Sequence, residues 1–129
     1  MKIDITRDVI TAAMKVHSEL GPGVLESAYE TCLAYELTKR GFEMERQKVL
    51  PIKYDGIEID CGYRVDLIVN DNVILELKAV AQVLPVHQAQ LLIYLKLSGK
   101  PPGLLINFHV VHLRDGITRM VNNFAEAER

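Results

Sequence analysis

The chain has 129 residues, of which 49% are hydrophobic and 25% charged, which predicts one globular domain over residues 1–129. Its formal net charge of −2 gives no overall basic excess, so a polyanionic partner would have to be held by a local basic patch. Cys32 and Cys61 form no CxxC unit and no segment approaches the roughly 20 apolar residues of a membrane span, so we expect a cytoplasmic protein without a membrane partner.

The first part of the chain is predicted to be helical. Hydrophobic residues recur at helical spacing over about residues 5–20, and this helix should end at the glycines and proline of residues 21–23. A second helix is predicted over about residues 25–40. Lys39 and Arg40 then lie in its last turn, where positive charge is favourable.

Strands dominate the rest of the chain, with one more helix between them. Strand-like runs cover about residues 43–54, 57–61, 63–69 and 73–80. A helix is predicted from Pro85 to Gly99, followed by a buried strand over residues 104–113, a turn, and a last strand over residues 117–121. This order predicts an α+β fold whose mixed, mainly antiparallel sheet is flanked by helices.

The predicted hairpin of residues 62–80, "GYRVDLIVNDNVILELKAV", carries four charges among apolar residues. With its turn centred on Asp71, Asp66 lies opposite Glu76, and Arg64 lies opposite Lys78. Alternation predicts that the other face is core. That core face comprises Tyr63, Val65, Leu67, Val69, Val73, Leu75, Leu77 and Ala79.

The charged face of this hairpin has two interpretations. Opposed carboxylates repel, so Asp66 and Glu76 need a proton, a cationic neighbour or a metal ion. A solvated ladder of diagonal ion pairs would suffice, with Arg64 near Glu76 and Asp66 near Lys78. If the following helix covers the face, however, the acids are partly buried, and a divalent cation such as Mg²⁺ or Mn²⁺ becomes the natural partner.

Three motifs of the chain resemble those of a known family. Asp66, nine intervening residues and "ELK" at residues 76–78 resemble the D…(D/E)xK signature of the PD-(D/E)XK nuclease superfamily. "QLLIY" at residues 90–94 resembles the QxxxY helix of its RecB-like branch, and "GVLESAY" at residues 23–29 resembles the namesake motif of the GxxExxY proteins. The resemblance covers almost the whole chain and implies a restriction-endonuclease-like core.

The resemblance also implies a metal site. Asp66 and Glu76 would be the main ligands of Mg²⁺ or Mn²⁺, joined by the backbone carbonyl of Leu77. Glu26 would add a carboxylate from the second helix, although an acidic residue is also favoured in a first helical turn for electrostatic reasons. Lys78 would orient or deprotonate the attacking water and offset charge on the phosphate.

Further residues surround this implied site. Gln90 and Tyr94 share a helix face and would donate to a phosphate or interact with Lys78, and plain core packing is the alternative for Tyr94. Tyr29 is expected to pack under Glu26 or to orient it. Two histidines in the motif-like stretches, His17 and His87, are expected to make structural hydrogen bonds and are left out of the site.

The resulting function is a metal-dependent nuclease that hydrolyses phosphodiester bonds, with DNA as the expected partner. A homodimer is expected because two DNA strands need two active sites. The alternative is a catalytically silent nuclease-fold module for nucleic-acid binding or assembly, and a purely structural domain is a third possibility. Modest basic character favours the module. The scattered basic candidates are Lys39, Arg40, Arg46, Lys48, Lys53, Lys96 and Lys100.

Overall fold

The computed structural model describes residues 4–100 and 102–121. The elements in chain order are α1 (Thr6–Leu20), α2 (Glu26–Lys39), β1 (Met44–Val49), β2 (Ile52–Tyr54), β3 (Ile57–Ile59), β4 (Arg64–Val69), β5 (Val73–Lys78), α3 (Pro85–Ser98), β6 (Pro102–Asn107), the 3₁₀ helix η1 (Leu113–Gly116) and β7 (Ile117–Val121). The predicted order of helices and strands is confirmed except that the predicted strand over residues 43–54 is divided into β1 and β2, and η1 is an addition. Within the described residues, none of the helices has the length and apolar character needed to span a membrane.

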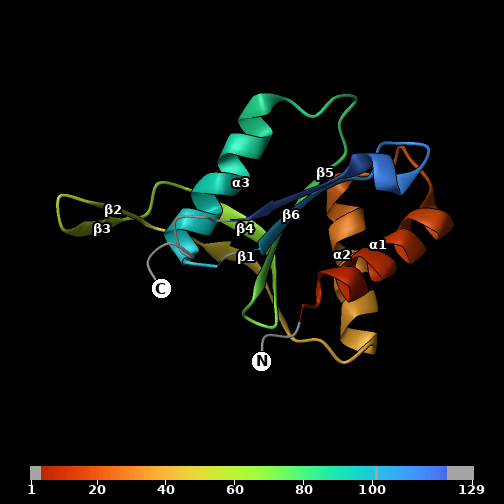
Figure 1. Cartoon of the computed structure of the whole chain (residues 1–129), viewed down its shortest axis with the longest axis horizontal. Coiled ribbons are helices and arrows are strands. Elements are labelled where there is room, and N and C mark those ends of the chain that lie inside the picture. Colours follow the sequence, from red (N-terminus) through yellow and green to blue (C-terminus); the bar gives the residue numbers. More distant parts are fainter. Residues whose placement is uncertain (1–3, 101, 122–129) are drawn as a thin grey trace.

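The main sheet has five strands in the order β1-β4-β5-β6-β7. Only the β5–β6 pair is parallel, and α3 forms the crossover between these two strands. Helices α1 and α2 lie on one side of the sheet and α3 lies on the other, while the β2–β3 hairpin projects from the body (Figure 1). The predicted mixed, mainly antiparallel sheet flanked by helices is therefore confirmed.

Each face of the sheet has its own hydrophobic cluster. The first cluster joins α1 and α2 to the sheet and includes Leu67, Val69, Val73, Leu75 and Leu77 of the β4–β5 hairpin. The second cluster lies under α3, where helix residues such as Leu91 and Leu95 pack against Ile68, Ile74 and Leu105. The face on which the charged hairpin residues were predicted is thus covered by α3.

Two predicted strands are shorter in the structure. The run over residues 43–54 breaks after Leu50, whose N–H still bonds to the Tyr63 carbonyl, because Pro51 has no N–H with which to continue a ladder. The predicted strand over residues 104–113 ends at Asn107, whose side chain accepts the N–H groups of Val80 and His109. The amide side chain therefore replaces the ladder at this point.

Strict alternation is wrong for the start of β4. Val65 was expected on the face of Leu67, yet Val65 and Tyr63 pack in the cluster under α3. Alternation requires regular extended backbone, and the β1–β4 pairing is interrupted at Gln47, whose φ is +51°. The change of face follows that interruption.

Candidate active site

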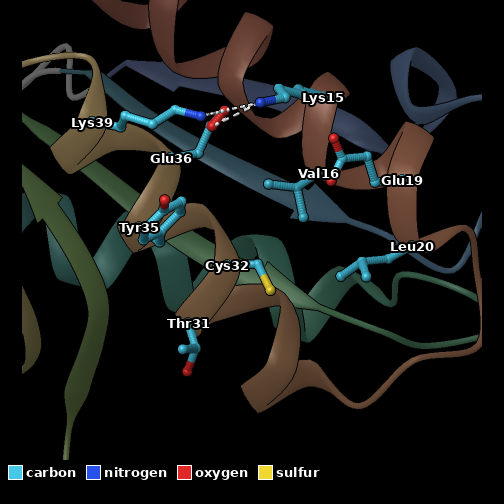
Figure 2. A pocket seen from close by; sticks show the side chains of 9 residues that line it. All are labelled: Lys15, Val16, Glu19, Leu20, Thr31, Cys32, Tyr35, Glu36 and Lys39. Atoms are coloured by element: carbon cyan, nitrogen blue, oxygen red, sulfur yellow. Dashed lines mark hydrogen bonds and ion pairs between the residues drawn. The ribbon is translucent and has the colours of Figure 1, made fainter.

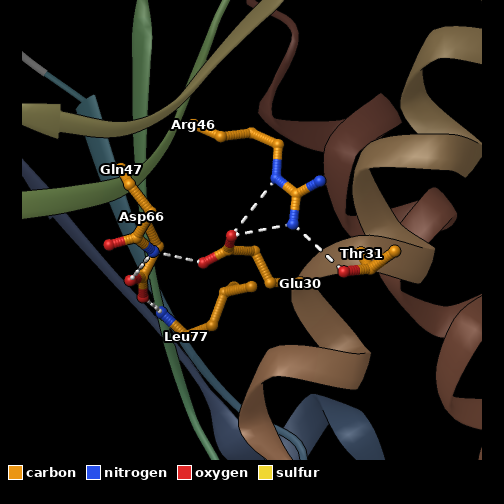
Figure 3. Close-up of polar contacts among 6 residues, drawn as sticks. All are labelled: Glu30, Thr31, Arg46, Gln47, Asp66 and Leu77. Atoms are coloured by element: carbon orange, nitrogen blue, oxygen red, sulfur yellow. Dashed lines mark hydrogen bonds and ion pairs between the residues drawn. The ribbon is translucent and has the colours of Figure 1, made fainter.

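The β4–β5 hairpin brings Asp66 and Glu76 together. Its predicted register is confirmed by the pairs Val69–Val73 and Leu67–Leu75. Beyond the Leu67–Leu75 pair, the Asp66 side chain replaces the backbone as hydrogen-bond acceptor, since its Oδ2 accepts the Leu77 backbone N–H at 2.7 Å. The carboxylate is therefore turned toward β5 (Figure 3).

The environment of Glu76 disfavours its charge. Glu76 is only 3% exposed. Its burial is the main cause that raises the pKa of Glu76 to about 9, followed by hydrogen bonding with Asp66 and by the negative charge of Asp66. The charge of Glu26 acts in the same direction, and the Lys78 ammonium acts against it. Without a cation, the position of Glu76 beside Asp66 therefore favours the protonated form of Glu76 at neutral pH.

The ion-pair ladder considered for these residues is not formed. Arg64 contacts Asp60 on the surface, with Nη1 3.3 Å from Oδ1. Across residues 4–100 and 102–121, no ion pair joins Arg64 to Glu76 or Lys78 to Asp66. The interpretation of this face as a solvated ladder is therefore wrong.

Helix α3 brings Gln90 and Tyr94 to the same place. Gln90 Nε2 donates to the Tyr94 hydroxyl at 2.9 Å, and Tyr94 is 2% exposed. Burial, followed by the negative charges of Glu76 and Asp66, raises the pKa of Tyr94 to about 12. The phenol therefore keeps its proton at neutral pH, and it lies within the electric field of both acids.

Glu26 begins α2 and is exposed to solvent. Tyr29 does not orient it in the way that was expected, because the Tyr29 hydroxyl donates to the Gly21 carbonyl and accepts the Val24 N–H at 3.2 Å. The Tyr29 ring is fully buried and stacks on Phe108 at 4.4 Å. Tyr29 thus fixes the loop that precedes Glu26 rather than its carboxylate.

Both histidines make structural hydrogen bonds, as predicted. His17 is buried and its Nε2 lies 2.8 Å from the Val110 carbonyl oxygen, to which it donates. His87 Nδ1 accepts the Leu84 N–H at 3.0 Å and so caps the start of α3.

A second group of polar residues lies beside Asp66 and was not predicted from the sequence. Gln47 of β1 donates from Nε2 to Asp66 Oδ1 at 3.1 Å and to Glu30 Oε1 at 2.6 Å. Arg46 holds the other oxygen of Glu30 through Nε and Nη2 (Figure 3). The only available signal was the β1–β4 register, which depends on residues far apart in the chain.

The acid pair fits a hard divalent cation by its chemistry. Carboxylate oxygens are the ligands that Mg²⁺ and Mn²⁺ prefer, and a cation would relieve the repulsion that keeps Glu76 protonated. The described residues contain no group of three or more His, Cys, Asp or Glu side chains arranged to hold a metal ion. The structure thus brings together two of the expected ligand residues, Asp66 and Glu76.

A cavity of about 420 Å³ lies elsewhere, between α1 and α2. Glu36 lines this cavity and is buried. Its Oε1 lies 2.7 Å from Lys15 Nζ and 3.6 Å from Lys39 Nζ (Figure 2). The hydrogen bond from Lys15 lowers the pKa of Glu36, so this carboxylate is charged and already neutralised. None of the predicted site residues lines this cavity.

Comparison with known proteins gives one match. A family model described as the PD-(D/E)XK nuclease superfamily matches residues 3–120 of the chain. No curated protein and no solved structure matches the chain.

Proposed function

The chain belongs to the PD-(D/E)XK nuclease superfamily, and on this basis we propose that it is a Mg²⁺- or Mn²⁺-dependent nuclease that hydrolyses phosphodiester bonds in DNA. The observation that supports this best is the sheltered pair of Asp66 and Glu76. Glu76 is buried beside Asp66, and no basic side chain of the described part of the chain forms an ion pair with either acid. A structural role would not require two unpaired carboxylates at this position.

The proposed cation site uses four oxygen ligands. Asp66 and Glu76 would hold the ion, together with the backbone carbonyl of Leu77 and the Glu26 carboxylate, directly or through water. When bound, the cation would polarise the phosphoryl oxygen and lower the pKa of a water molecule. The influence of Glu26 on the pKa of Glu76 supports its inclusion.

The remaining groups would act on the phosphate and on the attacking water. Lys78 follows Glu76 by two residues on β5, so its ammonium would orient the water and offset negative charge developing on the phosphate. The Tyr94 hydroxyl accepts a hydrogen bond from Gln90, which leaves its own proton free to be donated to a phosphate oxygen. Gln90 would support that donor and keep one N–H for the substrate.

Cleavage assays with Mn²⁺ test this proposal. Single-stranded DNA, double-stranded DNA and RNA are incubated with the wild type, with Lys78→Ala and with Arg7→Ala, whose arginine is exposed on α1. We expect cleavage of DNA that Lys78→Ala abolishes and Arg7→Ala retains. Equal cleavage by all three proteins, or none by the wild type, would contradict the assignment.

One observation favours a second candidate, a catalytically silent nucleic-acid-binding or assembly module. Several basic residues that were expected to hold phosphates are engaged with carboxylates of the chain itself, which weakens the basic character of the surface. These pairs are Lys39–Glu36, Arg46–Glu30, Lys48–Glu45 and Lys100–Asp71. If the wild type cleaves none of these substrates but shifts the same DNA in a gel, this alternative is supported.

The proposal also includes a cellular location, a domain organisation and an oligomeric state. We place the protein in the cytoplasm, where its free cysteines, Cys32 and Cys61, would stay reduced. We take residues 1–129 as a single nuclease-like domain. We also propose a homodimer, since cleavage of both strands of a duplex needs two active sites.

A further inference from the structure

Gln47 occupies an unusual backbone position directly beside the acid pair. The neighbouring pairs Arg46–Leu67 and Lys48–Val65 place it opposite Asp66 in the β1–β4 ladder. Its φ of +51° lies in the left-handed region, which a residue with a long side chain rarely adopts in a strand. Such conformations are found mainly where the surroundings enforce them, often at functional sites.

The side chain of Gln47 links two carboxylates from different elements. Its Nε2 donates to Asp66 Oδ1 at 3.1 Å and to Glu30 Oε1 at 2.6 Å. Because both acceptors are carboxylate oxygens, only the NH₂ group of the amide can face them, and both of its hydrogens are used. The amide orientation is therefore fixed by chemistry as well as by geometry.

Glu30 anchors this link to α2. It is 8% exposed, and its Oε2 accepts from Arg46 Nε at 3.2 Å and from Nη2 at 3.1 Å. Arg46 Nη2 also donates to Thr31 Oγ1 at 3.0 Å. The network of Figure 3 thus runs from α2 through β1 to Asp66, and the charge of Glu30 is compensated by Arg46.

Asp66 is consequently held from two sides. Leu77 N–H donates to one carboxylate oxygen and Gln47 donates to the other. Two donors on different oxygens oppose rotation of the carboxylate group and leave its remaining lone pairs for another partner. Ligating carboxylates are commonly held by such outer hydrogen bonds, which tune the affinity of the site.

We propose that Gln47 is a positioning residue that fixes the Asp66 carboxylate in its ligating orientation before a cation or substrate arrives. This inference rests on the proposed function for its purpose, since a fixed Asp66 matters only if Asp66 binds a cation. Gln47 acts through Asp66 and touches no reacting atom.

Two substitutions separate this role from general packing. Gln47→Asn keeps the amide and tolerates a positive φ, but it is shorter by one methylene, about 1.5 Å, and cannot reach both carboxylates. Gln47→Glu keeps the length but replaces the NH₂ group by an oxygen, which places a third carboxylate between two others. Gln47 is exposed, so neither change disturbs the hydrophobic core.

The contact itself is tested in the absence of metal by NMR of the side-chain amide groups. The Gln47 NH₂ resonances are identified by their loss in Gln47→Asn and are then followed in Asp66→Asn, with the exposed Gln88 as an internal reference. We expect the Gln47 signals to shift in Asp66→Asn while those of Gln88 stay. Unchanged Gln47 signals would overturn the proposal, whether or not the protein is an enzyme.

The purpose of the contact is tested by calorimetric titration with Mn²⁺. We expect Gln47→Asn to weaken Mn²⁺ binding about 10–100-fold and Gln47→Glu to weaken it at least as much, while Gln82→Asn, at an exposed position, binds like the wild type. Wild-type affinity in Gln47→Asn would overturn the positioning role. If the wild type binds no Mn²⁺, the proposed function fails, and the NMR result still decides whether Gln47 holds Asp66.

Discussion

The carboxylates of Asp66 and Glu76 interact across the β4–β5 hairpin, one residue beyond the point where the backbone pairing of the strands ends. Asp66 reaches this position by accepting the Leu77 N–H, and Glu76 is almost completely buried beside it. The fold therefore holds two carboxyl groups together, and in the metal-free protein Glu76 keeps its proton at neutral pH.

Stability of the metal-free protein should fall as the pH rises from about 5 to 9. Folded Glu76 has a pKa of about 9, against its ordinary value of 4.5, so in this range the folded state binds more protons than the unfolded state. At pH 8, Glu76→Gln should be about 1–3 kcal/mol more stable than the wild type, because the buried amide carries no charge. Urea denaturation in EDTA at several pH values measures the difference.

Other titrating groups should not obscure this result. The pKa values of Asp4, Glu36, Asp60 and Asp71 are lowered, so their contributions are lost only as the pH falls below the window. The control is Glu58→Gln, at an exposed position of the β2–β3 hairpin. An identical decline in Glu76→Gln and in Glu58→Gln would remove Glu76 as its cause.

Binding of Mn²⁺ at pH 7 should release about one proton. Glu76 is protonated in the metal-free protein at this pH, and a carboxylate must lose its proton to become a ligand. Calorimetric titrations in two buffers with different ionisation enthalpies measure the number of protons released. Heats that do not depend on the buffer would show that Glu76 is not deprotonated on binding.

Tyr94→Phe should reduce cleavage about 100–1,000-fold, as expected for the loss of one hydrogen-bond donor to the phosphate, with little loss of stability. The ring of Tyr94 packs in the cluster under α3 and is kept by phenylalanine, whereas the hydroxyl that accepts from Gln90 is removed. Initial rates and thermal unfolding are measured together, with Tyr54→Phe as control because Tyr54 is 70% exposed on the projecting hairpin. A loss of activity matched by an equal loss in Tyr54→Phe would exclude a specific role.

Asn107→Asp should destabilise the fold by about 2–3 kcal/mol. Asn107 is 3% exposed, and its amide nitrogen donates to the Val80 carbonyl at 2.9 Å, a bond that a carboxylate cannot make. Urea denaturation compares it with Asn72→Asp in the turn between β4 and β5. Equal stability of the two variants would mean that the hydrogen bonds between Asn107 and Val80 contribute nothing to the free energy of unfolding.

The fold follows largely from local signals in the sequence. Asp55 and Gly56 adopt the positive φ values that a two-residue hairpin turn requires, and Asn70 and Asp71 also have positive φ in the turn of residues 70–72 between β4 and β5. These turns fix the register, and the register places Asp66 beside Glu76. The acid pair was therefore predictable from residues close together in the chain.

The missed features depend on contacts between distant residues. The end of β6 at Asn107 is set by the two hydrogen bonds between its side chain and the Val80 backbone rather than by any turn signal of its own. Likewise, Gln47 meets Asp66 only because β1 pairs with β4 across the separate β2–β3 hairpin. A glutamine within a strand-like run carries no local indication of such a role, so the network on this side of Asp66 was not predicted.

The most direct test of a cation site at Asp66 and Glu76 is a calorimetric titration of the wild type and of Asp66→Asn with Mn²⁺. Asparagine can still accept the Leu77 N–H, so the variant should fold while losing the charge that a cation requires. We expect the wild type to bind one Mn²⁺ per chain and Asp66→Asn to bind it at least about 10–100-fold more weakly. Equal affinities in the two proteins would contradict the assignment of the Asp66–Glu76 pair as a cation site.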